Sequence, residues 1–234
     1  MIVALLVSLS LTSCSLSPSP RLGLHRDLTL RGASNDHRDV RRDKDGPATR
    51  EAILDAAMRT FTENTFAGSS MADVAQRAGV AVGSIYRHFP SKESLGNAVY
   101  QLWKGRALSA IVAAVDPDAP SRTAFAQMWR AFARFAAENP AAFAFLEYQQ
   151  HEAYLDSAGQ ATAHKVMAFV RDFIVRGQQA GELRSAPPDM LIALAYGALV
   201  GFTRDGRAGA PPSAADPALV TAAEEAVWAM LRAD

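Results

Sequence analysis

Apolar side chains recur along most of this chain at the three- and four-residue spacing of amphipathic helices. The first clear stripe is Ile53, Leu54, Ala57, Met58 and Phe61. It follows a proline at a first-turn position, where the missing N–H costs nothing, and predicts a helix from about 47 to 64. Further stretches of this kind lie near 70–78, 82–89, 91–115, 121–138, 140–156, 159–180, 187–204 and 216–233. Alternating β-branched runs are scarce, so we predict an all-α fold of about nine helices.

The second and third predicted helices are short and are separated by a tight turn. Ser70 and Asp73 form a capping box at the start of the second helix, and Gly79 tolerates the left-handed geometry of the turn. Ile85 and Phe89, four residues apart, hold the third helix against the first two. Two short helices joined in this way predict a helix-turn-helix, whose second helix enters the major groove of DNA.

The distribution of charge along the chain, and not the net charge, supports DNA binding. The chain has 24 Lys/Arg and 24 Asp/Glu, so its net charge does not indicate a nucleic-acid partner. Residues 106–234 carry 11 basic and 14 acidic side chains. Residues 74–92 contain no carboxylate, and their basic side chains and histidine are Arg77, Arg87, His88 and Lys92. We therefore expect a local basic face that neutralises DNA phosphates.

A specific run of residues covers most of this part of the chain. It comprises Thr49-Arg50-Glu51, Ile53-Leu54, Ala57, Ser70 to Ala75, and Ala78-Gly79-Val80-Ala81-Val82-Gly83-Ser84-Ile85-Tyr86-Arg87-His88-Phe89-Pro90-Ser91-Lys92-Glu93. The run resembles the signature of the tetracycline-repressor (TetR) family, and the helix count is similar too. The resemblance implies that the groove of DNA is faced by Val82, Gly83, Ser84, Tyr86 and Arg87. It implies phosphate contacts by Ser70, Tyr86, His88 and Lys92.

The residue types support most of these roles. Arg87 can reach O6 and N7 of guanine with two hydrogen bonds, a contact that discriminates against the wrong base by roughly 1–3 kcal/mol. Gly83 lets the backbone approach DNA, and Lys92 with nearby helix amides offers an anion site. The role of Val82 stays open, because its place on the helical wheel favours the core whereas the resemblance places it against DNA. Ala81 offers no capping side chain, which weakens the helix start by roughly 1 kcal/mol.

Residues 121–180 are rich in aromatic side chains, most of which are expected to pack as core. The resemblance implies that the helices of this half also enclose an effector cavity. We select large residues, several with a polar tip, as its candidate lining: Trp103, Trp129, Phe132, Tyr148 and His151. Such a lining suits a small apolar or aromatic effector.

Glu147 and His151 lie four residues apart on the predicted helix 140–156 and could form half of a metal site. No second pair has matching spacing, although His164 could fold nearby, so a surface ion pair is the preferred interpretation. No Ser-His-Asp or Cys-His arrangement can be argued from the sequence. We therefore expect no metal, no cofactor and no enzymatic activity.

The last two predicted helices carry apolar faces that fit an interface between two copies. The first face is Leu191, Leu194, Ala195, Ala198, Leu199 and Phe202, with Gly197 and Gly201 permitting close approach. The second is Leu219, Ala222, Ala223, Ala226, Val227 and Met230. We predict a homodimer joined by a four-helix bundle, with packing inside one chain as the alternative. A dimer would place two recognition helices on successive major grooves, roughly 34–36 Å apart.

We expect three parts: 1–46, a disordered arm or an over-long gene-model extension; 47–93, the helix-turn-helix domain; and 94–234, the effector-binding and dimerisation domain. The arm begins with an apolar run at 2–11, and Cys14 then follows in a setting like a lipoprotein cleavage site. The run is too short to span a bilayer and lacks a basic start. We therefore expect a cytoplasmic, nucleoid-associated protein with no membrane partner.

Together these patterns predict a ligand-responsive transcriptional regulator that binds a palindromic operator in double-stranded DNA. The resemblance alone implies that it is a repressor, released when a small-molecule effector shifts the fourth helix. Two alternatives are kept. One is a helical small-molecule-binding or scaffolding protein without DNA binding, and the other is an exported lipoprotein, which only residues 1–14 would support.

Overall fold

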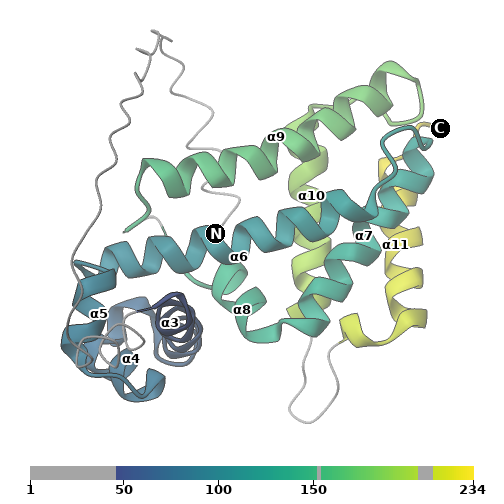
Figure 1. The fold of residues 1–234 in the computed structure, drawn as a ribbon. Coiled ribbons are helices and arrows are strands. Elements are labelled where there is room, and N and C mark those ends of the chain that lie inside the picture. The colour runs from purple at the N-terminus through teal and green to yellow at the C-terminus, as the bar shows by residue number, and fades with distance from the viewer. Residues whose placement is uncertain (1–45, 152–153, 205–212) are drawn as a thin grey trace, which may run out of the picture.

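The computed structural model describes residues 46–151, 154–204 and 213–234 (Figure 1). Within these ranges the fold is all-α with nine α-helices, as predicted, and a short 3₁₀ helix at Ser213–Ala215. The helices are α3 (Pro47–Gly68), α4 (Met71–Ala78), α5 (Val82–His88), α6 (Lys92–Ala114), α7 (Ser121–Glu138), α8 (Pro140–Tyr148), α9 (Ser157–Gln179), α10 (Pro188–Arg204) and α11 (Pro217–Leu231). Residues 1–45 of the predicted arm, with Cys14, lie outside the described residues.

Local chemistry sets the boundaries of the short helices. At the start of α4, Ser70 Oγ accepts a hydrogen bond from the Asp73 amide at 3.2 Å, and the Asp73 carboxylate accepts one from the Ser70 amide at 2.8 Å. Gly79 ends α4 in the left-handed region, with φ at 67°. Ala81 precedes α5 without a side-chain cap. The predicted capping box, turn and uncapped helix start are all confirmed.

α3 is longer than predicted and is kinked near its end. Thr65 adopts φ 61° and ψ 162° there, a backbone region that is almost restricted to glycine and costs other residues about 1–3 kcal/mol. Its carbonyl accepts a hydrogen bond from Ser69 Oγ at 2.6 Å. Because threonine is an ordinary polar residue in the helical pattern, nothing in the sequence indicated this kink.

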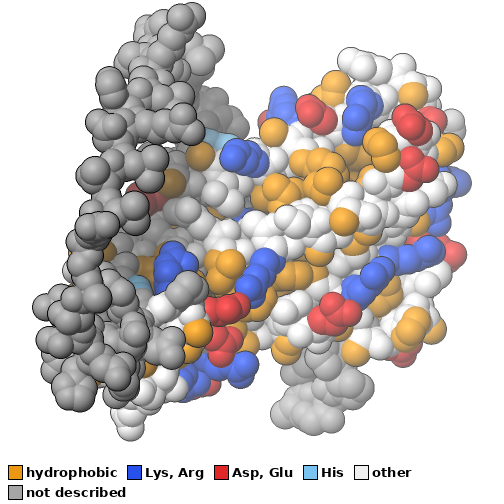
Figure 2. All heavy atoms as spheres, viewed as in Figure 1, with side chains coloured by type: hydrophobic (Ala, Val, Ile, Leu, Met, Phe, Trp, Pro, Cys, Tyr) orange, Lys and Arg blue, Asp and Glu red, His pale blue; other side chains and the backbone are white. Residues whose placement is uncertain are grey.

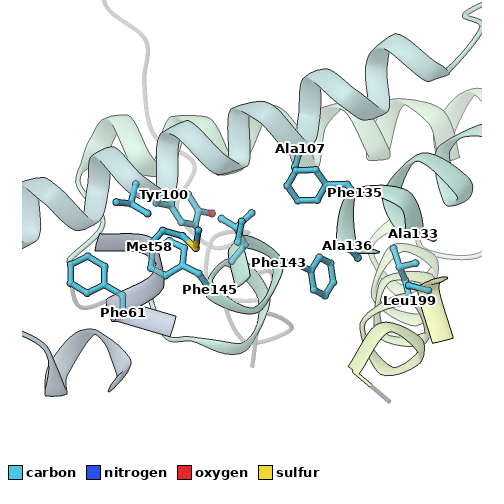
Figure 3. Packing of buried hydrophobic residues seen from close by; sticks show 14 of the residues in the cluster. Met58, Phe61, Tyr100, Ala107, Ala133, Phe135, Ala136, Phe143, Phe145 and Leu199 are labelled. Atoms are coloured by element: carbon cyan, nitrogen blue, oxygen red, sulfur yellow. The ribbon is translucent and has the colours of Figure 1, made fainter. Parts of the chain in front are cut away.

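α3, α4 and α5 form a small cluster, and the long helix α6 runs out of it along the rest of the molecule (Figure 1). α7 and α9 both pack along α6, and α7 also packs against α8 and α11. Figure 3 shows Phe61, Phe145 and Tyr100 close together where α3, α8 and α6 meet. Thr62 Oγ1 also donates a hydrogen bond from α3 to the carbonyl of Ala141 on α8, at 3.1 Å. The helix-turn-helix is therefore joined to the second half through both α6 and α8.

The predicted helix 140–156 is wrong in its second half, because α8 ends at Tyr148. Beyond it, the Gln149 side chain donates a hydrogen bond to the carbonyl of Phe61 on α3. The carbonyl of His151 accepts hydrogen bonds from the amides of Tyr154 and Leu155, at 3.1 and 3.0 Å, which form a turn. These contacts replace the helix with a segment that packs against α3.

The apolar faces of α10 and α11 are divided between the core and the surface. Leu191, Leu199 and Val227 are buried inside the chain, whereas Leu194 and Leu219 are each 48% exposed. The alternative of packing inside one chain therefore holds for the buried members, whereas the exposed ones are not used by the core. None of the helices in the described ranges is long and apolar enough to span a membrane.

Candidate functional site

The outer face of α5 presents the residues that were predicted to face DNA. Ile85 and Phe89 are 0% and 3% exposed and fix the helix to the core, as predicted. Val82 and Tyr86 are 39% and 50% exposed on the other side. The structure thus answers the open question about Val82, because its side chain lies on the surface and not in the core.

The same face combines a guanidinium group with small neighbours. The Arg87 Nη2 atom donates a hydrogen bond to Ser84 Oγ at 2.8 Å, one turn earlier on α5. A Cβ atom placed on Gly83 would meet nothing within 4 Å. The surface beside Arg87 is therefore open enough for another molecule to approach the backbone closely.

Fewer basic side chains are available to DNA than the carboxylate-free segment 74–92 suggested. Arg77 forms a two-pronged ion pair with Glu63 on α3, with Nη1 and Oε1 2.7 Å apart. The hydrogen bond from Arg77 holds the pKa of the Glu63 carboxyl below its usual value. Arg77 thus pairs with a carboxylate 14 residues away, outside the carboxylate-free segment 74–92.

Lys92 has a structural partner as well. Its Nζ atom donates hydrogen bonds to the carbonyls of Phe66 and Ser69, both at 3.0 Å, and lies 4.6 Å from the centre of the Phe66 ring. Ser91 caps α6 and accepts a hydrogen bond from the Ser94 amide at 3.1 Å. Lys92 therefore fastens the start of α6 to the end of α3, a role that the sequence did not predict.

The other predicted phosphate contacts differ in accessibility. Ser70 is exposed, but its hydroxyl donates to the Asp73 carboxylate at 2.7 Å within the capping box. His88 is half-buried, and its buried Nε2 atom has no hydrogen-bond partner in the described part of the chain. Arg50 of α3 was not singled out from the sequence. It is exposed, and its guanidinium carbon lies 5.2 Å from the centre of the Phe89 ring, which places a cation beside the end of α5.

The residues selected as effector lining do not form one group. Trp129 is 3% exposed, and its Nε1 donates to the carbonyl of Val220 at 3.1 Å, so it packs α7 against α11. Phe132 is half-buried, whereas Tyr148 is 36% exposed. Trp103 is half-buried on α6, and its buried Nε1 has no partner among the described residues.

His151 is 7% exposed and is held inside the segment after α8. Its Nε2 lies 3.3 Å from the Leu146 carbonyl and its Nδ1 lies 2.5 Å from the Tyr154 hydroxyl. Because a carbonyl can only accept, Nε2 carries the proton and Nδ1 accepts from Tyr154. Burial lowers the pKa of His151 to about 4, so the ring is neutral.

The predicted surface pair between Glu147 and His151 is wrong, because these residues do not share a helix. Glu147 instead pairs with Lys104 of α6, with Oε1 and Nζ 3.1 Å apart, and both side chains are buried. Among the residues that the structure describes, no three His, Cys, Asp or Glu side chains are grouped to hold a metal ion.

Comparison with known proteins matches both halves of the chain. Residues 53–99 match the bacterial regulatory proteins of the tetR family, and residues 107–233, more than half of the chain, match the tetracyclin repressor-like C-terminal domain. The chain belongs to the TetR family. It is therefore a transcriptional regulator with a helix-turn-helix DNA-binding domain, and regulators of this family are transcription factors rather than enzymes.

Individual TetR-family relatives support this assignment. The regulator AcrR of Shigella flexneri is 39% identical over 54 residues, which are 23% of this chain and only 25% of AcrR. A tetR family regulator from Shewanella sp. PV-4 covers 80% of this chain and 99% of its own, with a TM-score of 0.69 and 27% identity. A TetR family protein from Vibrio parahaemolyticus has a TM-score of 0.65 and 28% sequence identity, and the match covers 80% of this chain and 100% of that protein. The sequence likeness to AcrR thus spans about a quarter of that protein.

Lys92→Met is expected to lower the free energy of unfolding by about 1–3 kcal/mol, because two backbone carbonyls lose a charged donor. The salt dependence of DNA binding is expected to stay unchanged, because this ammonium group does not neutralise a phosphate in our account. Denaturant unfolding and DNA titrations over a range of salt concentrations measure the two effects. An unchanged stability with a salt slope lowered by about one per protomer would instead establish a phosphate contact. Lys165→Met, an exposed lysine of α9, is the matched control.

Stability is expected to fall by about 2 kcal/mol between pH 7.5 and pH 5 through His151 alone. The unfolded side chain takes up a proton near its ordinary pKa of 6.5, whereas the folded one does so only at about 4. The contribution is therefore complete above pH 6.5 and is lost as the pH falls toward 4. Unfolding curves of wild type and His151→Gln across this range isolate it. Equal pH slopes for the two proteins would contradict the assignment.

Proposed function

We propose that this TetR-family regulator is a repressor that binds a palindromic operator as a homodimer and is released by a small apolar or aromatic effector. The single observation that carries the proposal is the outer face of α5, where Val82, Gly83, Tyr86 and Arg87 are exposed beside a buried anchor. A helix that only filled the core would present apolar residues on both sides. In this proposal these residues and Ser84 face the groove, and Arg50, Ser70 and Tyr86 contact phosphates.

The surface of α10 and α11 supports the proposed dimer. On α10 the exposed stripe is Met190, Leu194, Gly197 and Gly201. A Cβ atom on either glycine would meet nothing within 4 Å in the isolated chain, so a second helix could approach closely. On α11 the exposed apolar positions include Leu219, Ala222 and Ala226. Large exposed leucines beside small residues suit a two-fold four-helix bundle.

Contacts between the halves support the proposed release by an effector. The Asn97 side chain of α6 accepts a hydrogen bond from the Asp156 amide at 2.9 Å and donates one to the Tyr154 carbonyl. The Tyr154 ring stacks on Phe66 of α3, with the ring centres 4.0 Å apart. A shift of α6 would therefore move the helix-turn-helix, and linkage requires DNA to weaken effector binding by the same factor.

We propose that the two halves of the chain have separate functions. Residues 47–93 form the DNA-binding unit and 94–234 the effector-binding and dimerisation unit, with 1–46 preceding both. α6 belongs structurally to each, because it is packed against α3 at one end and against α7 and α9 along its length. On the face of the second half that Figure 2 shows, charges of both signs are interspersed, an arrangement unsuited to DNA. We propose a cytoplasmic, nucleoid-associated location.

The test is a gel shift with the DNA upstream of the chain's own gene. We expect a shift that competitor DNA of random sequence does not remove. The alternative, a helical small-molecule-binding or scaffolding protein, requires that no shift occur even at low salt, where electrostatic binding is strongest. A reporter under the same upstream DNA then distinguishes repression from activation.

A further inference from the structure

A buried carboxylate oxygen between α6 and α8 lacks a partner. The Glu147 side chain is 2% exposed, and its Oε1 pairs with Lys104 Nζ at 3.1 Å. Its Oε2 is buried and accepts no hydrogen bond from any described residue. Buried polar atoms are almost always hydrogen-bonded, and an ionised acceptor left alone is costly. This oxygen therefore indicates a missing donor.

The pair carries both charges. Burial is the largest single influence and lowers the pKa of Lys104, but the charge and hydrogen bond of Glu147, together with Tyr100, raise that pKa above its usual value. Lys104 is therefore an ammonium ion, and the ion pair as a whole is neutral. A partner for Oε2 thus needs to supply an N–H or O–H group, while a net charge on that partner would have no compensating group in the pair.

Aromatic side chains cluster on and around the helix that carries Glu147. Phe143 lies one turn before Glu147 on α8, and its ring meets Phe132 edge to face at 5.7 Å and Tyr148 at 5.8 Å. Phe132 in turn meets Tyr196 of α10 edge to face at 6.3 Å. The Tyr196 hydroxyl is also buried without a partner among the described residues. This cluster is largely apolar and contains few polar atoms, a composition that suits a small aromatic molecule.

We propose that Glu147 Oε2 anchors the effector by accepting a hydrogen bond from an N–H or O–H group on a neutral aromatic ring. The ring packs against the side chains of Phe143 and Phe132. This inference rests on the proposed function, since it defines the chemical class of the effector. Phe132 and Tyr148 keep their predicted role, whereas Trp129 and His151 act in packing.

Indole and benzofuran test the donor directly, because they have nearly the same shape and differ by an N–H against an oxygen. Calorimetric titration of the full chain is expected to show indole binding at least about tenfold more tightly, the factor for a hydrogen bond to a charged acceptor. Equal affinities, or no binding of either compound, would overturn the proposal.

Glu147→Gln reverses the chemistry at one atom, because its amide oxygen can stay on Lys104 while its NH₂ group faces the ligand. The preference for indole is expected to disappear or reverse. Glu138→Gln, on an exposed glutamate of α7, is expected to keep it. The double variant Lys104→Met with Glu147→Gln leaves no unpaired buried charge, and provides the same test if the single variant does not fold. An unchanged preference for indole in whichever of these two Glu147→Gln proteins folds would overturn the proposal.

Operator binding is measured on the same preparations without any ligand. A chain that prefers indole through Glu147 but shifts no operator DNA would contradict the proposed function alone. A chain that binds its operator but does not distinguish indole from benzofuran would contradict only the anchor.

Discussion

Leu194→Glu is expected to convert the dimer to a monomer and to weaken operator binding at least about a hundredfold. The side chain is 48% exposed on α10, in the stripe that we propose to meet its own copy. A two-fold axis brings the same face of each protomer together, so a carboxylate there would be buried without a partner in both. An unpaired buried charge costs several kcal/mol, and a monomer also loses the second half-site.

Light scattering coupled to size exclusion measures the mass, and fluorescence anisotropy of a labelled operator measures affinity. Val112→Glu is the matched control, because Val112 is 46% exposed on α6, outside the proposed interface. It is expected to leave both values unchanged. A Leu194→Glu protein that stays dimeric at micromolar concentration would show that α10 is not the interface.

Arg87→Ala is expected to remove most of the preference for operator over random DNA while leaving the fold intact. Each guanine contact is worth roughly 1–3 kcal/mol, and a dimer makes it twice, so selectivity would fall by a factor of roughly 30 or more. Stability is expected to change little, because Arg87 lies on the exposed face of α5, where it donates to the nearby Ser84. Arg171→Ala, in an exposed ion pair on α9, is the control.

Competition titrations with operator and scrambled duplexes measure this selectivity, and thermal unfolding checks the fold. If Arg87→Ala retains the wild-type ratio between the two duplexes, Arg87 does not read bases. If both affinities fall equally with a smaller salt slope, Arg87 contacts phosphate instead.

The features that the sequence predicted correctly are those set within one or two turns of chain. Pro47 at the start of α3, the Ser70–Asp73 box and the left-handed Gly79 all act on neighbouring backbone groups. The helical spacing of residues 82–89 likewise placed Ile85 on the side that faces the core. Such signals need no knowledge of the rest of the fold.

Contacts between residues far apart in the chain could not be predicted from the sequence. The pairing of Arg77 with Glu63 and the bonding of Lys92 to carbonyls of α3 join positions 14 or more residues apart, so a basic segment looked more available to DNA than it is. Glu224 is another case. It is fully buried on α11 and paired with Arg122 and Arg130 of α7, within a helix whose sequence is mostly apolar.

Two of the candidate effector residues have packing contacts that the sequence could not show. Size and a polar tip selected Trp129 and His151, but in each case the tip already has a partner within the chain. The informative property is a buried polar atom without a partner, as at Glu147, and only the packed structure shows it. The sequence argued against a simple metal site at Glu147, but it could not identify Lys104 as the neighbour of that carboxylate.

Whether the outer face of α5 reads DNA sequence is tested by the ratio of affinities for operator and scrambled DNA. Fluorescence anisotropy at physiological salt measures this ratio. The exposed α5 face predicts a ratio of at least about a thousand, with two protomers bound per palindrome. A ratio near one, with binding that vanishes as salt rises, would show that this face does not read sequence and would contradict the account.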